Sequence, residues 1–179
     1  MEQLIMRWKN DGTPAVPATL PESIELKRFT EIDNALSEWV DIVRHMDNAA
    51  YNIEDEMTYY TDVMLCEKGY DDNLCFFLTV DGAPAATITV ICDYERKDGY
   101  IHMVTCKPEF RGRGLGNLLN DVALWCLKTE GMQTAYLTTD DWRIPAIKTY
   151  LKASFEPDLV SCPDFKERWE KIFEIIANK

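Results

Sequence analysis

A glycine-rich segment between two apolar runs carries the residues best suited to chemistry in this 179-residue chain. It reads Phe110-Arg-Gly-Arg-Gly-Leu-Gly116 and lies between an expected strand and an expected helix. The first backbone N–H groups of a helix have no intrahelical partners, and the helix dipole adds positive charge there. Glycine lets a phosphate approach these N–H groups, and Arg111 and Arg113 add two cations. The segment therefore predicts a site for a small polyphosphate.

Two common phosphate-binding patterns do not match this segment. A dinucleotide fingerprint needs GxGxxG, but Asn117 stands at its last glycine position. A P-loop needs GxxxxGK followed by Ser or Thr, and no such residues follow here. The spacing that remains is Arg111-x-x-Gly114-x-Gly116. An ordinary glycine-rich turn before a helix is the alternative interpretation.

This spacing resembles the first signature of the GNAT superfamily of acyl-CoA-dependent N-acyltransferases. In that family (Arg/Gln)-x-x-Gly-x-(Gly/Ala) lies between a strand and a helix, and Arg111, Gly114 and Gly116 occupy the three positions here. Pro108-Glu-Phe110 precedes the signature, as is often seen in the family. The resemblance begins in the apolar runs before the turn and spans roughly residues 75–160.

The second signature of the family reads Asn-x-x-Ala-x-x-x-Tyr-x-x-x-Gly-Phe. Ala146, Tyr150 and Phe155 match it about thirty residues downstream of the first signature. Arg143 stands where the family has Asn, which changes one contact on the cofactor side. Ser154 replaces the glycine, which a turn tolerates at some cost.

The resemblance implies acetyl-CoA as the cofactor. Its pyrophosphate would lie on the main chain of the turn, and its pantetheine arm between two splayed parallel strands, 100–106 and 134–139. A backbone N–H near Met103 or Val104 would hold the thioester carbonyl and stabilise the oxyanion. The residues that the resemblance places against the cofactor are Met103, Val104, Cys106, Arg111, Gly112, Arg113, Gly114, Leu115, Gly116, Asn117, Arg143 and Ala146.

Two residues are candidates for proton transfer. Tyr150 aligns with the family tyrosine that protonates the coenzyme A thiolate, and its hydroxyl is a proton donor. The alternative for Tyr150 is a core aromatic on a short helix. His102 lies on the expected strand that meets the thioester, where family members carry a base, and imidazole titrates near neutrality. The alternative for His102 is a strand histidine satisfied by a neighbour.

An acidic joint between the first two expected helices, residues 45–60, is the expected acceptor pocket, because the family forms its acceptor site there. Carboxylates at this joint would suit a cationic amine, although a solvated acidic loop is the alternative. Trp142 follows a later strand and could line either the pocket or the core. The residues expected to contact the acceptor are Asp47, Glu54, Tyr59 and Trp142.

Hydrophobic periodicity predicts one domain, 1–179, whose elements position these residues. Residues 1–20, with prolines near their end, are expected to form an extended arm. Apolar runs on either side of Asp81-Gly82 predict a hairpin. The order of elements predicts the α/β class, with a mixed six- to seven-stranded sheet and helices on both faces. The resemblance adds a splay between the fourth and fifth strands. The expected strands are 24–29, 74–80, 85–92, 100–106, 134–139 and 155–161, and the expected helices are 35–46, 58–67, 115–131, 146–152 and 163–177.

Composition restricts the partners. Nineteen Lys and Arg against thirty-one Asp and Glu give a net charge of −12, which disfavours nucleic acids and anionic membranes. No apolar run approaches the roughly 18 residues of a membrane helix, and the N-terminus has no secretory signal. A cytoplasmic location is therefore expected. Six cysteines without a CxxC pair, and two histidines, predict no metal site.

The expected function is an N-acetyltransferase that moves an acetyl group from acetyl-CoA to a primary amine by direct attack in a ternary complex. A small cationic amine or an amino-acid-like metabolite is the expected partner, and a homodimer is left open. The alternatives are a protein N-terminal acetyltransferase, a non-catalytic acyl-CoA sensor, and a nucleotide-binding module that shares only the glycine turn. Amine-dependent release of coenzyme A separates the enzymes from the sensor.

Overall fold

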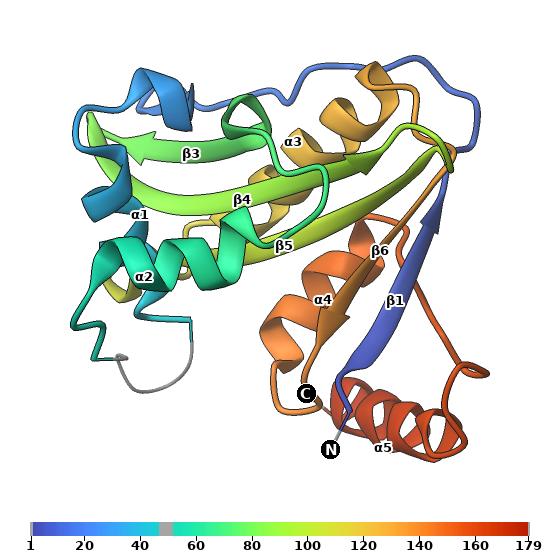
Figure 1. Cartoon of the computed structure of the whole chain (residues 1–179). Coiled ribbons are helices and arrows are strands. Elements are labelled where there is room, and N and C mark those ends of the chain that lie inside the picture. The colour runs from blue at the N-terminus through green and yellow to red at the C-terminus, as the bar shows by residue number, and fades with distance from the viewer. Residues whose placement is uncertain (1, 47–51, 179) are drawn as a thin grey trace.

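The computed structural model describes residues 2–46 and 52–178 and shows one seven-stranded sheet, ordered β2-β3-β4-β5-β6-β1-β7 (Figure 1). Neighbouring strands are antiparallel except β5 and β6, which are parallel. This mixed sheet confirms the predicted α/β class. The strands are β1 (Leu4–Lys9), β2 (Ile24–Arg28), β3 (Cys75–Val80), β4 (Ala83–Asp93), β5 (Asp98–Cys106), β6 (Thr134–Thr139) and β7 (Glu156–Pro157).

Helices cover both faces of the sheet, with α2 in front of it and α3 behind it in Figure 1. The α-helices are α1 (Ala35–Val43), α2 (Glu56–Tyr60), α3 (Leu115–Thr129), α4 (Ile144–Lys152) and α5 (Phe165–Ala177). Helix α2 continues into a π-helical turn, η2 (Thr61–Leu65), and the 3-10 turns are η1 (Phe29–Glu31), η3 (Asp72–Leu74) and η4 (Pro108–Phe110).

The two covered faces explain why the central strands read as continuous apolar runs. Side chains alternate along a strand, so Phe76 enters the core that contains α3 and α5, and Phe77 enters the smaller core that contains α1 and α2. All six residues of β3 are buried. The polar–apolar alternation of a half-exposed strand is therefore absent from β3.

The first residues correct one expectation. Residues 4–9 were expected to belong to an extended arm, but they form β1, which lies between β6 and β7. Leu4, Met6 and Trp8 are buried, whereas Arg7 and Lys9 are exposed. This period of two was the available signal, and the prolines that predicted an arm lie further along the chain. Within the expected arm, residues 1–20, the stretch after β1 has no regular secondary structure and runs past α3.

The expected splay lies between β5 and β6. These strands pair only where Asp98–Ile101 meets Thr134–Leu137. Beyond Ile101, Met103 and Val104 both stand opposite Ile88, because the register shifts between Thr87 and Thr89. This β-bulge places Met103 at φ 52° and bends the strand away from its neighbour. The parallel strands are therefore joined at one end and open at the other.

Two details near the C-terminus differ from expectation. The strand expected over 155–161 is reduced to the two residues of β7. The carboxylate of Asp158 accepts hydrogen bonds from the backbone N–H groups of Val160 and Ser161, which makes a turn where a strand would continue. On α5, helical spacing predicts that Phe173 points inward, but this residue is 42% exposed.

Candidate functional site

The turn before α3 presents a row of backbone donors. Gly112 and Gly114 have φ of 77° and 81°, and Gly114 is the residue that starts the helix. A Cβ at either position would meet nothing within 4 Å, so glycine is needed here for its conformation, and the space beside the turn is open. Among the described residues, no backbone acceptor bonds the N–H groups from Gly112 to Gly116.

The donor row is shorter than the sequence suggested. The N–H of Arg111 donates to the carbonyl of Pro108 at 3.2 Å, and the N–H of Asn117 donates to that of Gly114 at 3.0 Å. These two backbone groups are already satisfied. Five consecutive donors, 112–116, remain to face an anion at the positive end of the α3 dipole.

The two arginines of the turn have different surroundings. The guanidinium of Arg111 donates through Nη2 to the carbonyl of His45 at 2.6 Å and through Nε to that of Cys106 at 3.2 Å. Arg111 therefore ties the turn to the end of α1 and to β5. The guanidinium of Arg113 lies 5.3 Å from the centre of the Phe110 ring and is exposed, so its charge is available to a ligand.

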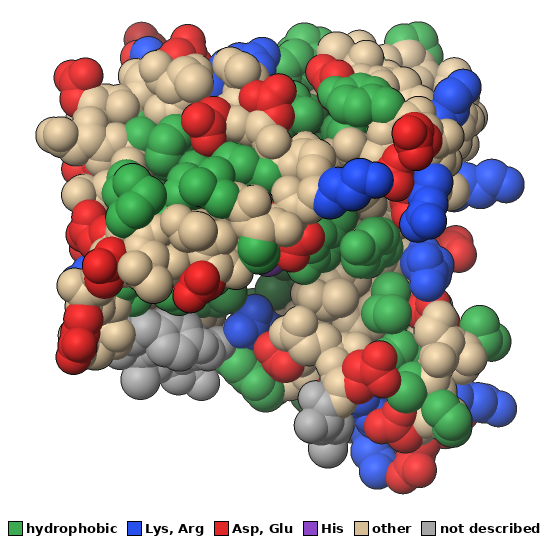
Figure 2. Space-filling view, viewed as in Figure 1, with side chains coloured by type: hydrophobic (Ala, Val, Ile, Leu, Met, Phe, Trp, Pro, Cys, Tyr) green, Lys and Arg blue, Asp and Glu red, His purple; other side chains and the backbone are tan. Residues whose placement is uncertain are grey.

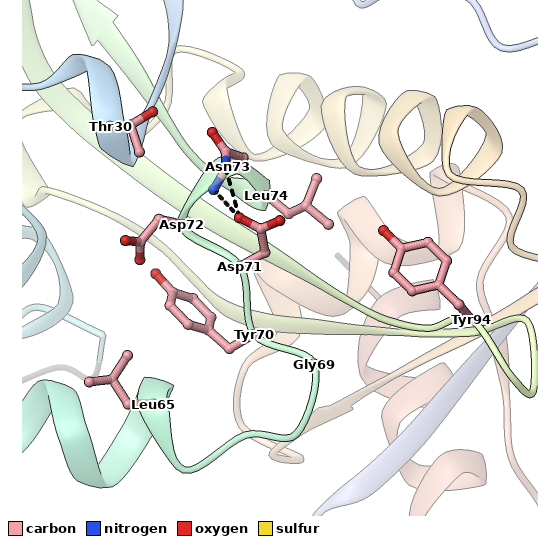
Figure 3. Close-up of a pocket in the computed structure, with 9 residues that line it drawn as sticks. All are labelled: Thr30, Leu65, Gly69, Tyr70, Asp71, Asp72, Asn73, Leu74 and Tyr94. Atoms are coloured by element: carbon pink, nitrogen blue, oxygen red, sulfur yellow. Dashed lines mark hydrogen bonds between the residues drawn. The ribbon is translucent and has the colours of Figure 1, made fainter.

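A cavity of about 550 Å³ is distant from this turn (Figure 3). Its polar groups largely satisfy one another: Asp71 accepts from the N–H and side-chain amide of Asn73. The hydroxyls of Tyr60 and Tyr70 bond each other, and that of Tyr60 also donates to Asp72 at 3.0 Å. Burial and the nearby acidic groups raise the pKa of Tyr60 and Tyr70. This cluster stabilises the loop before β3.

A cavity of 480 Å³ begins at the glycine turn and reaches β5 and α4. Met103, Arg113 and Arg143 do not line it. Arg143 forms an ion pair with Asp140 at 3.2 Å, and its guanidinium lies 4.9 Å from the centre of the Trp142 ring. The expected cofactor residues that the structure brings together around the cavity are Val104, Cys106, Arg111, Gly112, Gly114, Leu115, Gly116, Asn117 and Ala146.

Tyr150 also lines this cavity, although its side chain is only 6% exposed. Burial raises its pKa to about 12, so the hydroxyl keeps its proton at neutral pH. Gly116 helps to bring Tyr150 here, because its missing side chain leaves room for Thr149, whose Cγ2 would be 3.4 Å from a Cβ. Thr149 and Pro145 were not expected in the site. They flank expected residues on α4, and helical spacing is the signal that could have found them.

His102 lies on the other side of β5 from α3, next to η2. Its Nε2 donates to the carbonyl of Val63 at 3.0 Å, which leaves Nδ1 to accept from the hydroxyl of Tyr100 at 3.0 Å. Burial lowers the pKa of His102. The ring of Tyr100 in turn stacks on Tyr136, with centroids 4.7 Å apart. His102 is therefore a neutral imidazole held between two partners.

The expected acceptor residues do not form one group. Glu54 and Tyr59 line an open cavity of 340 Å³ at the start of α2, together with Asp62. Trp142 does not line it; this side chain is 50% exposed beside Arg143. Asp47 lies outside the described residues. The described residues hold no group of three or more His, Cys, Asp or Glu side chains able to bind a metal ion. None of their helices is long and apolar enough to span a membrane.

Comparisons with known proteins agree with this geometry. The model of the acetyltransferase (GNAT) family matches residues 39–155. Mycothiol acetyltransferase from Actinosynnema mirum is 29% identical over 158 residues, covering 86% of this chain and 51% of that protein. The protein of the same name from Nocardia farcinica is 28% identical over 157 residues, covering 82% and 50%. The chain thus spans about half the length of these curated relatives.

Solved structures share the fold. A GCN5-related N-acetyltransferase from Sphaerobacter thermophilus matches with a TM-score of 0.64 at 18% identity, covering 88% of this chain and 50% of that one. An acetyltransferase of the GNAT family from Staphylococcus aureus matches with a TM-score of 0.59 at 15% identity, covering 79% and 90%. At such identities the likeness concerns the fold alone.

Proposed function

Because this chain belongs to the acetyltransferase (GNAT) family, a family of acetyl-transferring enzymes, we propose that it acetylates a primary amine with acetyl-CoA. The observation that carries the proposal is the continuity of one cavity. It begins at the glycine turn, where Gly112, Gly114 and Gly116 line it, follows β5 along the splay, and ends at Tyr150. An anion-binding end and a proton-donating end thus belong to the same space.

The residues around the cavity fit acetyl-CoA. Its volume of 480 Å³ is within the range of small-molecule sites. The N–H groups of Gly112 to Gly116, with Arg113 beside them, would hold the pyrophosphate. Beyond Ile101, the edge of β5 that faces β6 has no strand partner among the described residues, so Val104 and Cys106 can pair with an extended pantetheine arm. Acetyl-CoA supplies an activated acetyl carbonyl and a thiolate leaving group.

The bulge on β5 provides the candidate oxyanion site. At Met103 and Val104 two residues oppose one, so a backbone N–H is released from the β4 ladder. A fixed N–H donor near a carbonyl stabilises the negative charge that develops on its oxygen during amine attack. The backbone of this segment, rather than the Met103 side chain, performs this role, because that side chain packs in the smaller core.

Tyr150 is the proposed acid. Its pKa of about 12, raised by burial, keeps the hydroxyl protonated at neutral pH. Tyr150 lies in the wall of the cavity, where its hydroxyl would give its proton to the departing sulfur. Arg143 lowers this pKa slightly and so favours the transfer.

His102 is the proposed base, acting through Tyr100. The amine proton passes to the hydroxyl oxygen of Tyr100 while the hydroxyl proton passes to Nδ1 of His102. The ring then carries a positive charge, which the Val63 carbonyl and Glu67 favour and burial opposes. The neutral tautomer required at the start is the one that the Val63 hydrogen bond selects.

The proposed acceptor is a small cationic amine or an amino-acid-like metabolite. Glu54, Asp62 and Glu67 lie along α2 and η2 on the same side of the sheet as His102 and would attract a cation. The names of the two curated relatives also favour a small molecule over a protein N-terminus. We further propose a cytoplasmic location, because six cysteines are free and reducing compartments maintain free thiols.

The test is a panel of amines incubated with acetyl-CoA and the whole protein, with coenzyme A release followed by a thiol reagent. The proposal requires release that depends on both the amine and the protein. Acetyl-CoA binding without release from any amine would indicate a sensor. Binding of ATP or NAD without binding of acetyl-CoA would indicate a nucleotide-binding module.

A further inference from the structure

A small cavity lies beside the proposed base and has no assigned role. It measures 220 Å³ and lies over β4, β5 and the start of β6, next to the turn after η2. In the same view as Figure 1, the molecular surface is hollowed between the regions of α2 and of β1 and β6 (Figure 2). Tyr100 belongs to the cavity wall and to the hydrogen bond with His102, so the cavity continues directly from the proposed proton path.

The wall of this cavity combines flat aromatic surface with carboxylates, those of Glu67, Asp93 and Asp98. Tyr100 and Tyr136 stack with an interplanar angle of 13°, which leaves a continuous aromatic surface. Glu67 lies close enough to act electrostatically on Tyr100, Tyr136 and His102 alike. An aromatic wall beside a carboxylate is the chemistry that recognises an ammonium group.

Glu67 differs from the other carboxylates of the wall. Asp93 pairs with Arg96 at 3.8 Å, and Asp98 accepts a hydrogen bond from the Thr134 hydroxyl at 2.6 Å. Within the described part of the chain, no cation pairs with the half-buried Glu67. Lys68 also lines the cavity, but its side chain is exposed at the rim. The negative charge available to a ligand inside the cavity is therefore that of Glu67.

The distance to the bulge defines the shape of the ligand. Met103 is three positions after Tyr100, which corresponds to about 10 Å along a strand. A ligand that reaches from the bulge into the cavity is therefore elongated, with its reacting nitrogen near the bulge and a second group near Glu67.

We propose that the acceptor is an elongated diamine whose non-reacting ammonium lies in this cavity, between Glu67 and the stacked Tyr100 and Tyr136. This inference rests on the proposed acetyltransferase function and specifies its substrate. The neutral amine near the bulge reacts, while the charged end fixes the length and direction of the chain. A monoamine of equal length lacks the second contact and binds more weakly.

Binding to the whole protein without acetyl-CoA tests the charged contact. Hexamethylenediamine and hexylamine differ only in the terminal nitrogen, and calorimetric titration should show about five- to tenfold tighter binding of the diamine. Glu67→Gln should remove this preference, whereas Glu22→Gln, an exposed carboxylate on the approach to β2, should preserve it. Equal affinities for the two amines in the unmodified protein would overturn the inference. Tighter binding of the length-matched amino acid aminocaproate would also overturn it, because Lys68 and Arg96 would then govern the site.

Kinetics separates failure of this inference from failure of the proposed function. With Glu67→Gln, the KM for hexamethylenediamine should rise about five- to tenfold, while the KM for acetyl-CoA stays within about twofold. Release of coenzyme A with an unchanged diamine KM in this variant would refute the inference and leave the acetyltransferase function intact. No release with any amine would refute the proposed function, even if the diamine bound to Glu67.

Discussion

At the scale of single residues, the two proposed proton-transfer groups lie on opposite sides of β5. Tyr150 lines the cavity on the α3 and α4 side, and His102 contacts η2 on the other side. A strand that separates acid from base suits a reaction in which the amine approaches from one side and the thiolate leaves on the other. Burial keeps the first group protonated and the second unprotonated at neutral pH.

Replacing Tyr150 by phenylalanine should remove the acid without removing the ring from the cavity wall. Turnover should fall by about ten- to a thousandfold, because the reaction loses its general acid. The KM for acetyl-CoA should change little, because the donors at 112–116 are untouched. Steady-state measurement of coenzyme A release gives both quantities, and an unchanged kcat would exclude Tyr150 as the acid.

His102 should titrate below the usual histidine pKa near 6.5, because burial is the largest influence on it and disfavours the imidazolium. The unfolded chain therefore binds this proton more readily than the folded protein. Protonation of His102 should accordingly lower the free energy of unfolding as the pH falls through the pKa that this histidine has in the unfolded chain. An NMR titration of the imidazole signals measures the pKa directly. A value above that of an unfolded histidine would contradict the burial and the hydrogen bonds described here.

At the scale of elements, the turn before α3 is rigid because of its anchors. Lys107 forms ion pairs with Asp41 at 2.6 Å and with Glu38 at 3.6 Å, both on α1. Arg111 adds its hydrogen bond to His45 just after that helix. The donor row is therefore held by α1 as well as by α3, and a phosphate meets it already formed.

Gly114→Ala should weaken acetyl-CoA binding, whereas Gly131→Ala should not. Both glycines flank α3, both have positive φ (81° and 75°), and a Cβ at either one meets nothing within 4 Å. Each substitution should therefore cost about 1 kcal/mol of stability through backbone strain. Only the Gly114 change alters the donor row. Calorimetric titration of both variants measures the difference, and equal affinities would argue against the phosphate site.

Residues 4–9 were expected to belong to an arm but form strand β1. The packing of this strand leads to a second prediction at this scale. Met6 is fully buried between β6 and β7, so Met6→Ala should destabilise the protein by about 2–5 kcal/mol. Val16, 70% exposed, is the control, and Val16→Ala should cost less than about 0.5 kcal/mol. Denaturant unfolding measures both changes. If both substitutions changed the free energy of unfolding by a similarly small amount, residues 4–9 would instead form a loose arm.

Local patterns predicted most of the elements. The Asp81-Gly82 turn, the run at 134–139 and the glycine turn each carry their own structural signal in neighbouring residues. The position of β1 depends on β6 and β7, which are distant in the sequence, so its three alternating apolar residues were outweighed by the prolines after them. The pairing of Tyr100 with Tyr136 depends in the same way on the β5–β6 register. The sequence therefore predicted the glycine turn proposed to hold the phosphates, whereas the residues of the proposed acceptor end come together only in the fold.

At the scale of the whole molecule, the net charge of −12 coexists with the proposed anion site. The site uses backbone donors and a helix dipole, which do not appear in the charge balance of the sequence. Acidic side chains lie elsewhere, including along α2 and η2 on the side of His102. The fold thus separates the proposed anion-binding turn from the acidic side proposed to attract a cation, with β5 between them.

The most direct test of this arrangement is the identity of the product. Hexamethylenediamine would be incubated with the whole protein and acetyl-CoA deuterated in the acetyl group, and the amine would then be examined by mass spectrometry. We expect a singly acetylated diamine that carries the deuterium label and forms in proportion to the protein present. The Tyr150→Phe variant should form it much more slowly. A protein that binds acetyl-CoA but leaves every amine of the panel unlabelled would contradict it.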